Sequence, residues 1–480
     1  MYSLVVVCTF ASLTYAVSIV SPTLVSRMPN FWGLSIQSIP TVLGNDCILD
    51  GVNVKNGMRV LAFSEAPLHT PISCESIERT CKNGKLSGGD EYAYVSCTAN
   101  LIIPHTSIGP KGEDIAITDL SNGILLMLRA SAPHVDLVSK KTVSAIYTLE
   151  STDNGATWQE KSIATLYNNT VDLSYSVNGP ALIQEPSGRL LGAYHVLTRS
   201  IQKNSSVHSI ETIYSDDIGV TWHTLSQVDV ITVTKDQLQT GLWEPFLIEP
   251  TKRPQVLQVY YAKERDNAEV CTQAKAGVRK GQDIVMKESL DGGKTWSALP
   301  LVVLRNGQSR EGVPTLTELQ DGSLVLSHEH ARYSQCGNTH PQSGFVPAIA
   351  LSNDGGHTWI DTGTAYLPLS DKLRSGWPHL LQLQDGRLAI RFSTQNSPST
   401  TTRQVRVLLT TNIPSFVHPP VWEVQPRPVM NGDLQWGTIA QARNGDIIVT
   451  GGSDEIGGVQ PQMYRVLPIS YFLAREADSR

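Results

Sequence analysis

The chain has 480 residues, of which 40% are hydrophobic and 17% charged, and its formal net charge is -6. This composition is typical of a folded globular protein and excludes a largely disordered chain. The sequence contains no long run of lysine or arginine, so nothing in it favours a nucleic-acid partner.

The first sixteen residues, MYSLVVVCTFASLTYA, are mostly apolar and end in small residues. This pattern predicts a secretory signal peptide over residues 1–16, and therefore a secreted, extracellular protein. No later segment approaches the roughly 20 consecutive apolar residues of a membrane-spanning helix. We therefore expect residues 17–480 to form a single domain with no membrane partner.

Cysteines are concentrated in one part of the mature chain. Beyond Cys8 the sequence has Cys47, Cys74, Cys81, Cys97, Cys271 and Cys336. Four of these fall within residues 47–97, which predicts a Cys-rich insertion pinned by disulfides in an oxidising compartment. Buried free thiols remain the alternative. Glycosylation sequons begin at Asn168 and Asn204, which fits a secreted glycoprotein.

A short box, Ser-x-Asp-x-Gly-x-Thr-Trp, recurs along the chain, at residues 151–158, 215–222, 289–296 and 352–359. Each box belongs to a longer unit that opens with an apolar strand, a turn containing Gly and a second apolar strand. Six such openings are present, at 114–128, 180–194, 245–261, 314–327, 378–392 and 437–450. Dipeptides such as Asp321-Gly322 and Asn444-Gly445 between apolar strands are strong hairpin signals.

Units of four antiparallel strands at intervals of about 60 to 75 residues predict an all-β fold, a six-bladed β-propeller of four-stranded antiparallel blades. The last unit is short of strands. We expect an N-terminal segment, within residues 38–43 or 59–66, to complete it. A seven-bladed ring that uses residues 38–66 as its own blade is the alternative.

The boxes themselves are expected to be structural. An Asp in a turn accepts hydrogen bonds from backbone amides ahead of it, Gly tolerates a positive φ, and Trp supplies a large apolar surface. We therefore expect a turn between the third and fourth strands of a blade, with no catalytic role for Asp153, Asp217, Asp291 or Asp354.

These boxes resemble those of the sialidase superfamily of Asp-box (BNR-repeat) propellers, and the resemblance covers nearly the whole mature chain. It implies that ligands bind at the central axis, at positions just before the first strand of each unit. Those positions are Glu113-Asp114, Asn178 to Pro180, Trp243 to Pro245, Arg310 to Gly312, Arg374 to Pro378 and Gln435 to Gly437. Acids and aromatic platforms there suit a sugar.

Within that superfamily, three segments are most similar to the exo-arabinanases of glycoside hydrolase family 93: GLWEPFL (241–247), SREGVP (309–314) and PSGRLLGAYH (186–195). The resemblance implies that Glu244 is a catalytic acid/base. The second family glutamate corresponds to Asn178, whose amide cannot act as a nucleophile or a base. We therefore expect Glu311 to be the second catalytic carboxylate, with Asp114 as the alternative.

In sialidases, the first of the arginines that bind the substrate carboxylate lies in an Arg-Ile-Pro motif. This sequence has Ser38-Ile39-Pro40 there, and Pro67 where a further arginine is usual. The predicted function is therefore an exo-acting, arabinanase-like glycosidase acting on polysaccharide ends. The alternatives are an exo-sialidase and a non-catalytic glycan-binding propeller.

The remaining candidates are substrate contacts, and no motif requires a cofactor or a metal. Trp436 is a further candidate sugar platform, although each tryptophan also suits packing between blades. We expect a monomer that binds a glycan. The predicted substrate-binding residues are Asn178, Trp243, Arg310, Arg374, Trp377 and His379.

Overall fold

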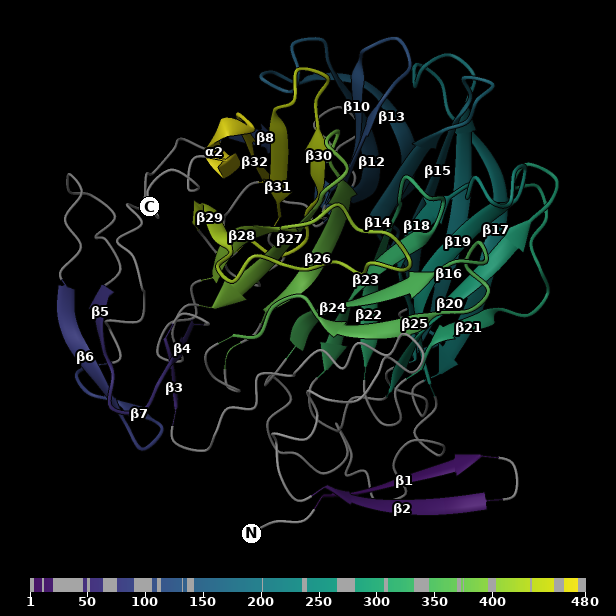
Figure 1. The fold of residues 1–480 in the computed structure, drawn as a ribbon. Coiled ribbons are helices and arrows are strands. Elements are labelled where there is room, and N and C mark those ends of the chain that lie inside the picture. The colour runs from purple at the N-terminus through teal and green to yellow at the C-terminus, as the bar shows by residue number, and fades with distance from the viewer. Residues whose placement is uncertain are drawn as a thin grey trace.

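In a computed structural model of the chain, nearly all regular structure is β-strand (Figure 1). The structure describes residues 4–10, 13–19, 46–49, 52–63, 76–89, 106–109, 114–131, 133–135, 142–200, 202–234, 240–265, 281–305, 310–331, 345–368, 373, 375–395, 403–431, 434–452 and 462–473. The one helix in this part is α2 (Ser470–Leu473). No helix there is long and apolar enough to cross a membrane.

Six antiparallel sheets of four or five strands make up the main body of the described chain, and we number them I to VI. Sheet I contains β9 (Ile115–Asp119), β10 (Leu125–Ala130), β11 (His134–Val135), β12 (Thr142–Ser151) and β13 (Gln159–Asn168). Sheet II contains β14 (Leu173–Gln184), β15 (Leu190–Ser200), β16 (Ser205–Ser215) and β17 (His223–Thr234). Sheet III contains β18 (Leu242–Ile248), β19 (Leu257–Glu264), β20 (Gln282–Ser289) and β21 (Leu301–Leu304).

The remaining three sheets follow the same order. Sheet IV contains β22 (Glu311–Glu318), β23 (Leu324–Ala331), β24 (Phe345–Ser352) and β25 (Ile360–Thr364). Sheet V contains β26 (Ser375–Gln382), β27 (Leu388–Gln395), β28 (Arg403–Leu409) and β29 (Arg427–Asn431). Sheet VI contains β30 (Ile439–Gln441), β31 (Ile447–Gly451), β32 (Gln462–Leu467) and β8 (Thr106–Gly109).

Sheet VI confirms that an N-terminal segment completes the last unit, but the predicted segment was wrong. Residues 106–109 form the fourth strand, β8, which pairs with β32. Residues 59–63 instead form β5, which pairs with β6 in a separate small sheet, so their backbone groups are already used. The other proposed segment, residues 38–43, lies outside the described residues.

The core is a series of hydrophobic layers between successive sheets. The second strand of each sheet is buried between two neighbours, so β10 is buried along its whole length while the outer strand β25 is exposed along its whole length. This burial on both faces explains why the inner strands read as continuous apolar runs. The first strands also contact one another in sequence, and β30 contacts both β26 and β9.

The Asp boxes are turn structures that also join neighbouring sheets. In the second box, Asp217 accepts hydrogen bonds from the backbone N–H of Thr221 (2.8 Å) and from its hydroxyl (2.6 Å). The indole N–H of Trp222 donates to Thr148 in sheet I at 2.9 Å. The first box is also joined to its neighbour, sheet VI. There the Tyr464 hydroxyl donates to the carbonyl of Ala156 at 2.7 Å.

All four boxes lie between the third and fourth strands of their sheets, as predicted, and each Asp is held by the hydroxyls of its own Ser and Thr. Their carboxylates are therefore occupied by the turn. This supports the expected structural role of Asp153, Asp217, Asp291 and Asp354.

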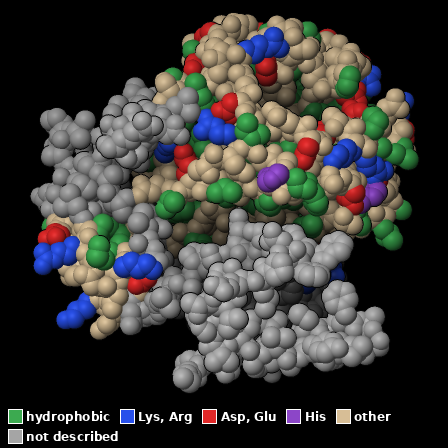
Figure 2. All heavy atoms as spheres, viewed as in Figure 1, with side chains coloured by type: hydrophobic (Ala, Val, Ile, Leu, Met, Phe, Trp, Pro, Cys, Tyr) green, Lys and Arg blue, Asp and Glu red, His purple; other side chains and the backbone are tan. Residues whose placement is uncertain are grey.

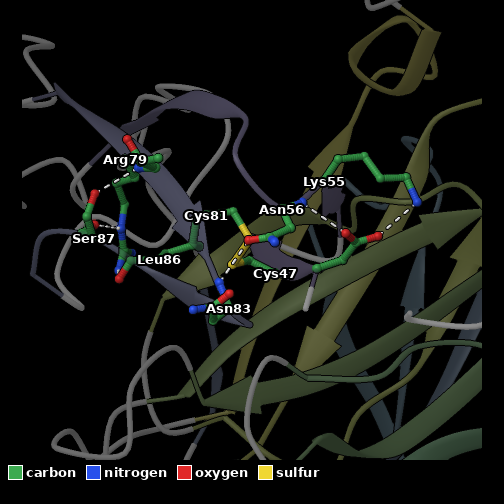
Figure 3. The surroundings of a disulfide bond; sticks show 10 residues. Cys47, Lys55, Asn56, Arg79, Cys81, Asn83, Leu86 and Ser87 are labelled. Carbon is green, nitrogen blue, oxygen red and sulfur yellow. Dashed lines mark hydrogen bonds and ion pairs between the residues drawn. A yellow bond between two sulfur atoms is a disulfide. The ribbon is translucent and has the colours of Figure 1, made fainter. Parts of the chain in front are cut away.

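A Cys-rich unit precedes the main body and includes the described part of residues 47–97 (Figure 1). It contains β3 (Cys47–Leu49), β4 (Val52–Val54), β5 (Arg59–Phe63), β6 (Ser76–Lys82) and β7 (Lys85–Leu86). A disulfide joins Cys47 to Cys81, and both half-cystines are buried in a small cluster with Ala62 (Figure 3). The predicted disulfide framework is thus confirmed for this pair; Cys74, Cys97, Cys271 and Cys336 lie outside the described residues.

The segment predicted as a signal peptide, residues 1–16, contains β1 (Leu4–Phe10) and the first part of β2 (Leu13–Ile19), and these strands pair as an antiparallel hairpin. On the face drawn in Figure 2, basic and acidic side chains are interspersed, which is consistent with the small net charge.

We predict that Ser289→Ala lowers stability without affecting ligand binding. Ser289 is buried, and its Oγ accepts the backbone N–H of Gly293 at 2.8 Å. Loss of that acceptor leaves a buried donor unsatisfied, which costs about 1 to 3 kcal/mol. Thermal unfolding should show a lower midpoint, whereas Ser187→Ala in an exposed turn should leave it unchanged. Equal midpoints for the two variants would contradict a structural role for the box.

Candidate active site

The first strands of all six sheets converge on one cavity. It is lined by Asp114 and Ile115, Gly179 and Pro180, Glu244 to Phe246, Val313 to Thr315, Trp377 to His379, and Trp436 with Gly437. These are the positions that repeat alignment placed at the axis, except in sheet IV, where Val313 to Thr315 replace Arg310 to Gly312. Residues up to 323 positions apart in sequence, Asp114 and Gly437, thus share one site.

A repeated backbone irregularity places these residues. In sheets II to V the first strand breaks register with the second, and a residue with positive φ precedes a proline at each break. The residues with positive φ are Gly179 (φ 60°), Glu244 (49°), Val313 (49°) and Trp377 (53°). A β-branched residue in this region is an outlier that the surrounding structure must hold in place.

Such a bulge accommodates proline, which cannot donate to the ladder, and re-aims the neighbouring side chain. Three of the four left-handed residues carry side chains, and all three line the cavity. The bulge therefore turns Glu244 inward. The sequence analysis did not predict this bulge.

Glu244 has the electrostatic environment of a carboxylic acid that stays protonated at neutral pH. Its Oε2 accepts the backbone N–H of Val313 at 3.2 Å. Burial raises the pKa of Glu244 to about 8, and the negative charges of Glu329 and Asp114 add to this effect. A neutral carboxyl group at a cavity wall is suited to donate a proton.

Two further carboxylates flank Glu244. Asp114 lines the same cavity, and its Oδ2 accepts the backbone N–H of Gly179 at 2.9 Å. Glu329, on the second strand of sheet IV, accepts the backbone N–H of Trp377 at 2.6 Å through Oε1. Sequence analysis missed Glu329, although a charged residue within the otherwise buried strand LVLSHEHA was a signal for it.

Glu311, the predicted second catalytic acid, is 1% exposed and is not among the residues that line the cavity. Its carboxylate lies 2.8 Å from Nδ1 of His328 and 3.0 Å from Nδ1 of His330. Burial raises the pKa of Glu311, but the contacts with the two histidines outweigh burial and hold it below its usual range. The bulge that follows Glu311 brings Val313 to the cavity in its place.

The predicted substrate-binding residues divide into two groups. Trp377 and His379 line the axial cavity, together with Trp436, whose ring lies 5.5 Å from that of Trp377. Burial and, to a smaller extent, the nearby charge of Arg391 lower the pKa of His379 to about 3. His379 is therefore neutral at physiological pH.

The second group is not among the residues that line the axial cavity; its described members are Asn178, Trp243 and Arg310. Asn178 Oδ1 lies 2.6 Å from Nδ1 of His195, and the ring of Trp243 packs 5.0 Å from that histidine. Arg310 donates to Glu264 at 2.9 Å instead of pairing with Glu311. Arg374 lies outside the described residues.

Arg391 is a buried cation that sequence analysis missed. It is fully buried on β27, and its Nη1 donates to the carbonyl of Trp377 at 2.9 Å. Burial lowers the pKa of Arg391 to about 9, while the charge of Asp114 opposes that shift. Arg391 lies opposite His379 in the pairing of β26 with β27, so its place near the axis can be recognised only once the strand register is known. Within the described residues, no group of three or more His, Cys, Asp or Glu side chains forms a metal site.

A family model for the BNR repeat-like domain matches residues 104–390, and the chain therefore belongs to this family. The match spans most of the main body, from β8 to β27, and supports the predicted resemblance to the sialidase superfamily. No curated protein sequence matches the chain.

Two solved structures with TM-scores above 0.5 agree on the fold. The glycoside hydrolase family 93 α-L-arabinofuranosidase of Fusarium graminearum, solved with arabinobiose, aligns with a TM-score of 0.51 and 18% identity over 76% of this chain and 99% of that chain. A Dyadobacter fermentans protein of unknown function aligns with a TM-score of 0.54 and 16% identity, over 76% and 98%. A Streptococcus pneumoniae sialidase aligns at 0.48 and 13%, over 88% and 81%.

We predict that Gly179→Ala disturbs the site more than Gly188→Ala. A Cβ at residue 179 would lie 3.2 Å from both Cα of Glu244 and Cδ of Pro245, whereas nothing lies within 4 Å at residue 188. Both glycines have a positive φ, so both variants carry a backbone penalty, of about 1 kcal/mol. Only Gly179→Ala should also move the Glu244 segment, which a shift in the Glu244 titration by NMR would report. Identical titrations in the two variants would contradict this packing.

The raised pKa of Glu244 also predicts a pH dependence of stability. Between pH 4.5 and about 8 the folded chain binds a proton at Glu244 that the unfolded chain has lost, so folding stability falls as pH rises through this window. The total effect is on the order of a few kcal/mol. Glu244→Gln should remove it, so denaturant unfolding at about pH 5 and about pH 9 should show a smaller loss for the variant than for the wild type. Parallel curves for the two proteins would refute a buried neutral Glu244.

Proposed function

We propose that the six sheets form a closed six-bladed β-propeller over residues 17–480. Its support is the set of contacts between sheet VI and sheet I, which repeat those between other neighbouring sheets. Leu125 packs against Ala440 and Ile448, and Ile115 packs against Tyr464. The axial cavity, to which every sheet contributes, is the natural centre of such a ring.

We propose that the protein is a secreted glycoside hydrolase with Glu244 as its general acid. The observation that carries this proposal is the half-buried carboxyl group of Glu244, with a pKa of about 8, in a cavity that it shares with Asp114. Glycoside cleavage requires one carboxyl group to protonate the leaving oxygen and a second to act as nucleophile or to activate water. When two carboxyl groups lie in environments that give them different pKa values, the group with the higher pKa can act as the acid and the other can stay ionised.

Asp114 is the second carboxylate that this geometry favours. It lines the cavity and lies within the electrostatic range of both Glu244 and the Arg391 cation. Glu311 is paired with two histidines outside the cavity lining, which suits a structural role. The family resemblance supports an exo-acting, arabinanase-like specificity, and the Cys47–Cys81 disulfide supports secretion because such bonds persist in oxidising compartments.

A non-catalytic glycan-binding propeller is the second candidate, and the axial cavity itself favours it. The cavity volume is about 50 Å³, well below the roughly 300 to 1,000 Å³ of typical ligand pockets. A sugar ring at the axis therefore requires side chains of the cavity lining to move. An exo-sialidase is less well supported, because the described residues that line the cavity include no arginine to grip a carboxylate.

We expect Glu244→Gln and Asp114→Asn each to reduce kcat on linear arabinan by about 100-fold or more, because each removes one member of the pair. Glu311→Gln should retain activity, and wild-type kcat/KM should fall above about pH 8, where Glu244 loses its proton. The measurement is the release of arabinose by purified, folded variants. Unchanged hydrolysis by Glu244→Gln would refute the assignment, and loss in Glu311→Gln but not Asp114→Asn would make Glu311 the second acid.

A further inference from the structure

A second and larger cavity lies beside the axial one. Its volume is about 600 Å³, which falls within the size range of small-ligand pockets, about 300 to 1,000 Å³. It is formed by the ends of strands in sheets II and III. Trp243 lines it while the next residue, Glu244, lines the axial cavity, so the two cavities lie on either side of this point of the chain.

The lining of the larger cavity has the composition of a sugar site. It combines hydroxyl and amide groups with the imidazole of His208 and one indole; the hydroxyl, amide and indole groups include those of Ser200, Asn204, Ser206, Thr234, Thr240 and Trp243. Sugar hydroxyls require such hydrogen-bonding partners, and the apolar faces of a sugar ring stack on indole. The Trp243 ring is fixed by contacts of 5.0 and 4.9 Å with the rings of His195 and His208, which are themselves stacked.

The cavity also carries one positive charge that the described side chains do not neutralise. Arg199 is exposed at its wall and forms no ion pair within the described part of the chain. Glu264, the acid in the lining, is already paired with Arg310 at 2.9 Å. Burial lowers the pKa of His208 to about 4, so this histidine adds no charge at neutral pH. The local charge therefore favours an anionic group.

We propose that this cavity binds an acidic sugar unit, a uronate or a sulfated sugar, with Arg199 pairing its anionic group and Trp243 supporting its ring. This inference depends on the proposed function only in taking the ligand to be part of a glycan. A guanidinium pairs with carboxylate or sulfate through two parallel hydrogen bonds. Contact through Trp243 places such a unit next to the sugar that Glu244 would act on.

The test is calorimetric binding by the full chain carrying Glu244→Gln, produced in a host without N-glycosylation because Asn204 begins a sequon. The probes are a galacturonic acid trimer, the same trimer with its carboxyl groups reduced to alcohols, and a sulfated galactose trimer. We expect at least one acidic trimer to bind about tenfold more tightly than the reduced trimer, and this preference to weaken as salt is raised. The two acidic probes separate carboxylate from sulfate recognition.

Adding Arg199→Ala should abolish the tenfold preference, whereas Arg199→Lys should retain part of it. Arg189→Ala is the matched control, since Arg189 lies just before the opposite end of β15 and pairs with Asp216. Equal binding of acidic and reduced trimers, or an unchanged preference in Arg199→Ala, would overturn the proposal. The chain with Glu244 intact could fail to hydrolyse any glycan and still bind acidic trimers through Arg199. That result would refute the hydrolase proposal and leave this binding site established.

Discussion

The positions of the axial side chains in sheets II to V depend on one backbone constraint, a bulge that holds a left-handed residue before a proline on the innermost strand. It recurs at Gly179, Glu244, Val313 and Trp377. Val313 and Trp377 are strained, because neither a β-branched nor a bulky side chain favours a positive φ. The strain persists since neighbouring bulges interlock: Val313 donates its N–H to Glu244, and Trp377 donates its N–H to Glu329. Strain of this kind is typical of functional sites.

The interlocked bulges determine the electrostatics of the site. They shield Glu244 partly from water and bring it near two other carboxylates, and both effects raise its pKa. On the opposite side they place the carbonyl of Trp377 against Arg391, whose Nε and Nη2 are buried without a hydrogen-bond partner among the described residues. Burying a cation in this way is costly. Asp114, which interacts electrostatically with both groups, joins the acidic and basic sides of the axis.

The sequence was sufficient for the parts of the fold that follow from local rules. The boxes, the Asp-Gly and Asn-Gly hairpins and the positions that converge at the axis, except those of sheet IV, were predicted, because each depends on turn chemistry or on a repeat that survives in the residues. What could not be predicted depends on register. Glu311 was placed at the cavity because a bulge two residues later is invisible in sequence, and Glu329 and Arg391 were missed because they reach the axis from second strands. The strand that completes sheet VI was assigned to residues 38–43 or 59–66 instead of 106–109 because short strands carry little pattern.

The two cavities together suggest how a narrow axis can serve a polymer. A cavity of about 50 Å³ excludes a sugar ring until side chains of its lining shift, whereas the larger 600 Å³ cavity is already open. Binding energy gained in the larger cavity by a neighbouring unit of the glycan is then available to offset the displacement of those side chains. Since Trp243 and Glu244 are consecutive on one strained segment, a ligand that stacks on Trp243 acts directly on the backbone that aims the acid. In that arrangement the chain end at the axis would be engaged only when the unit beside it is also bound, which is a basis for selecting polymers over single sugars.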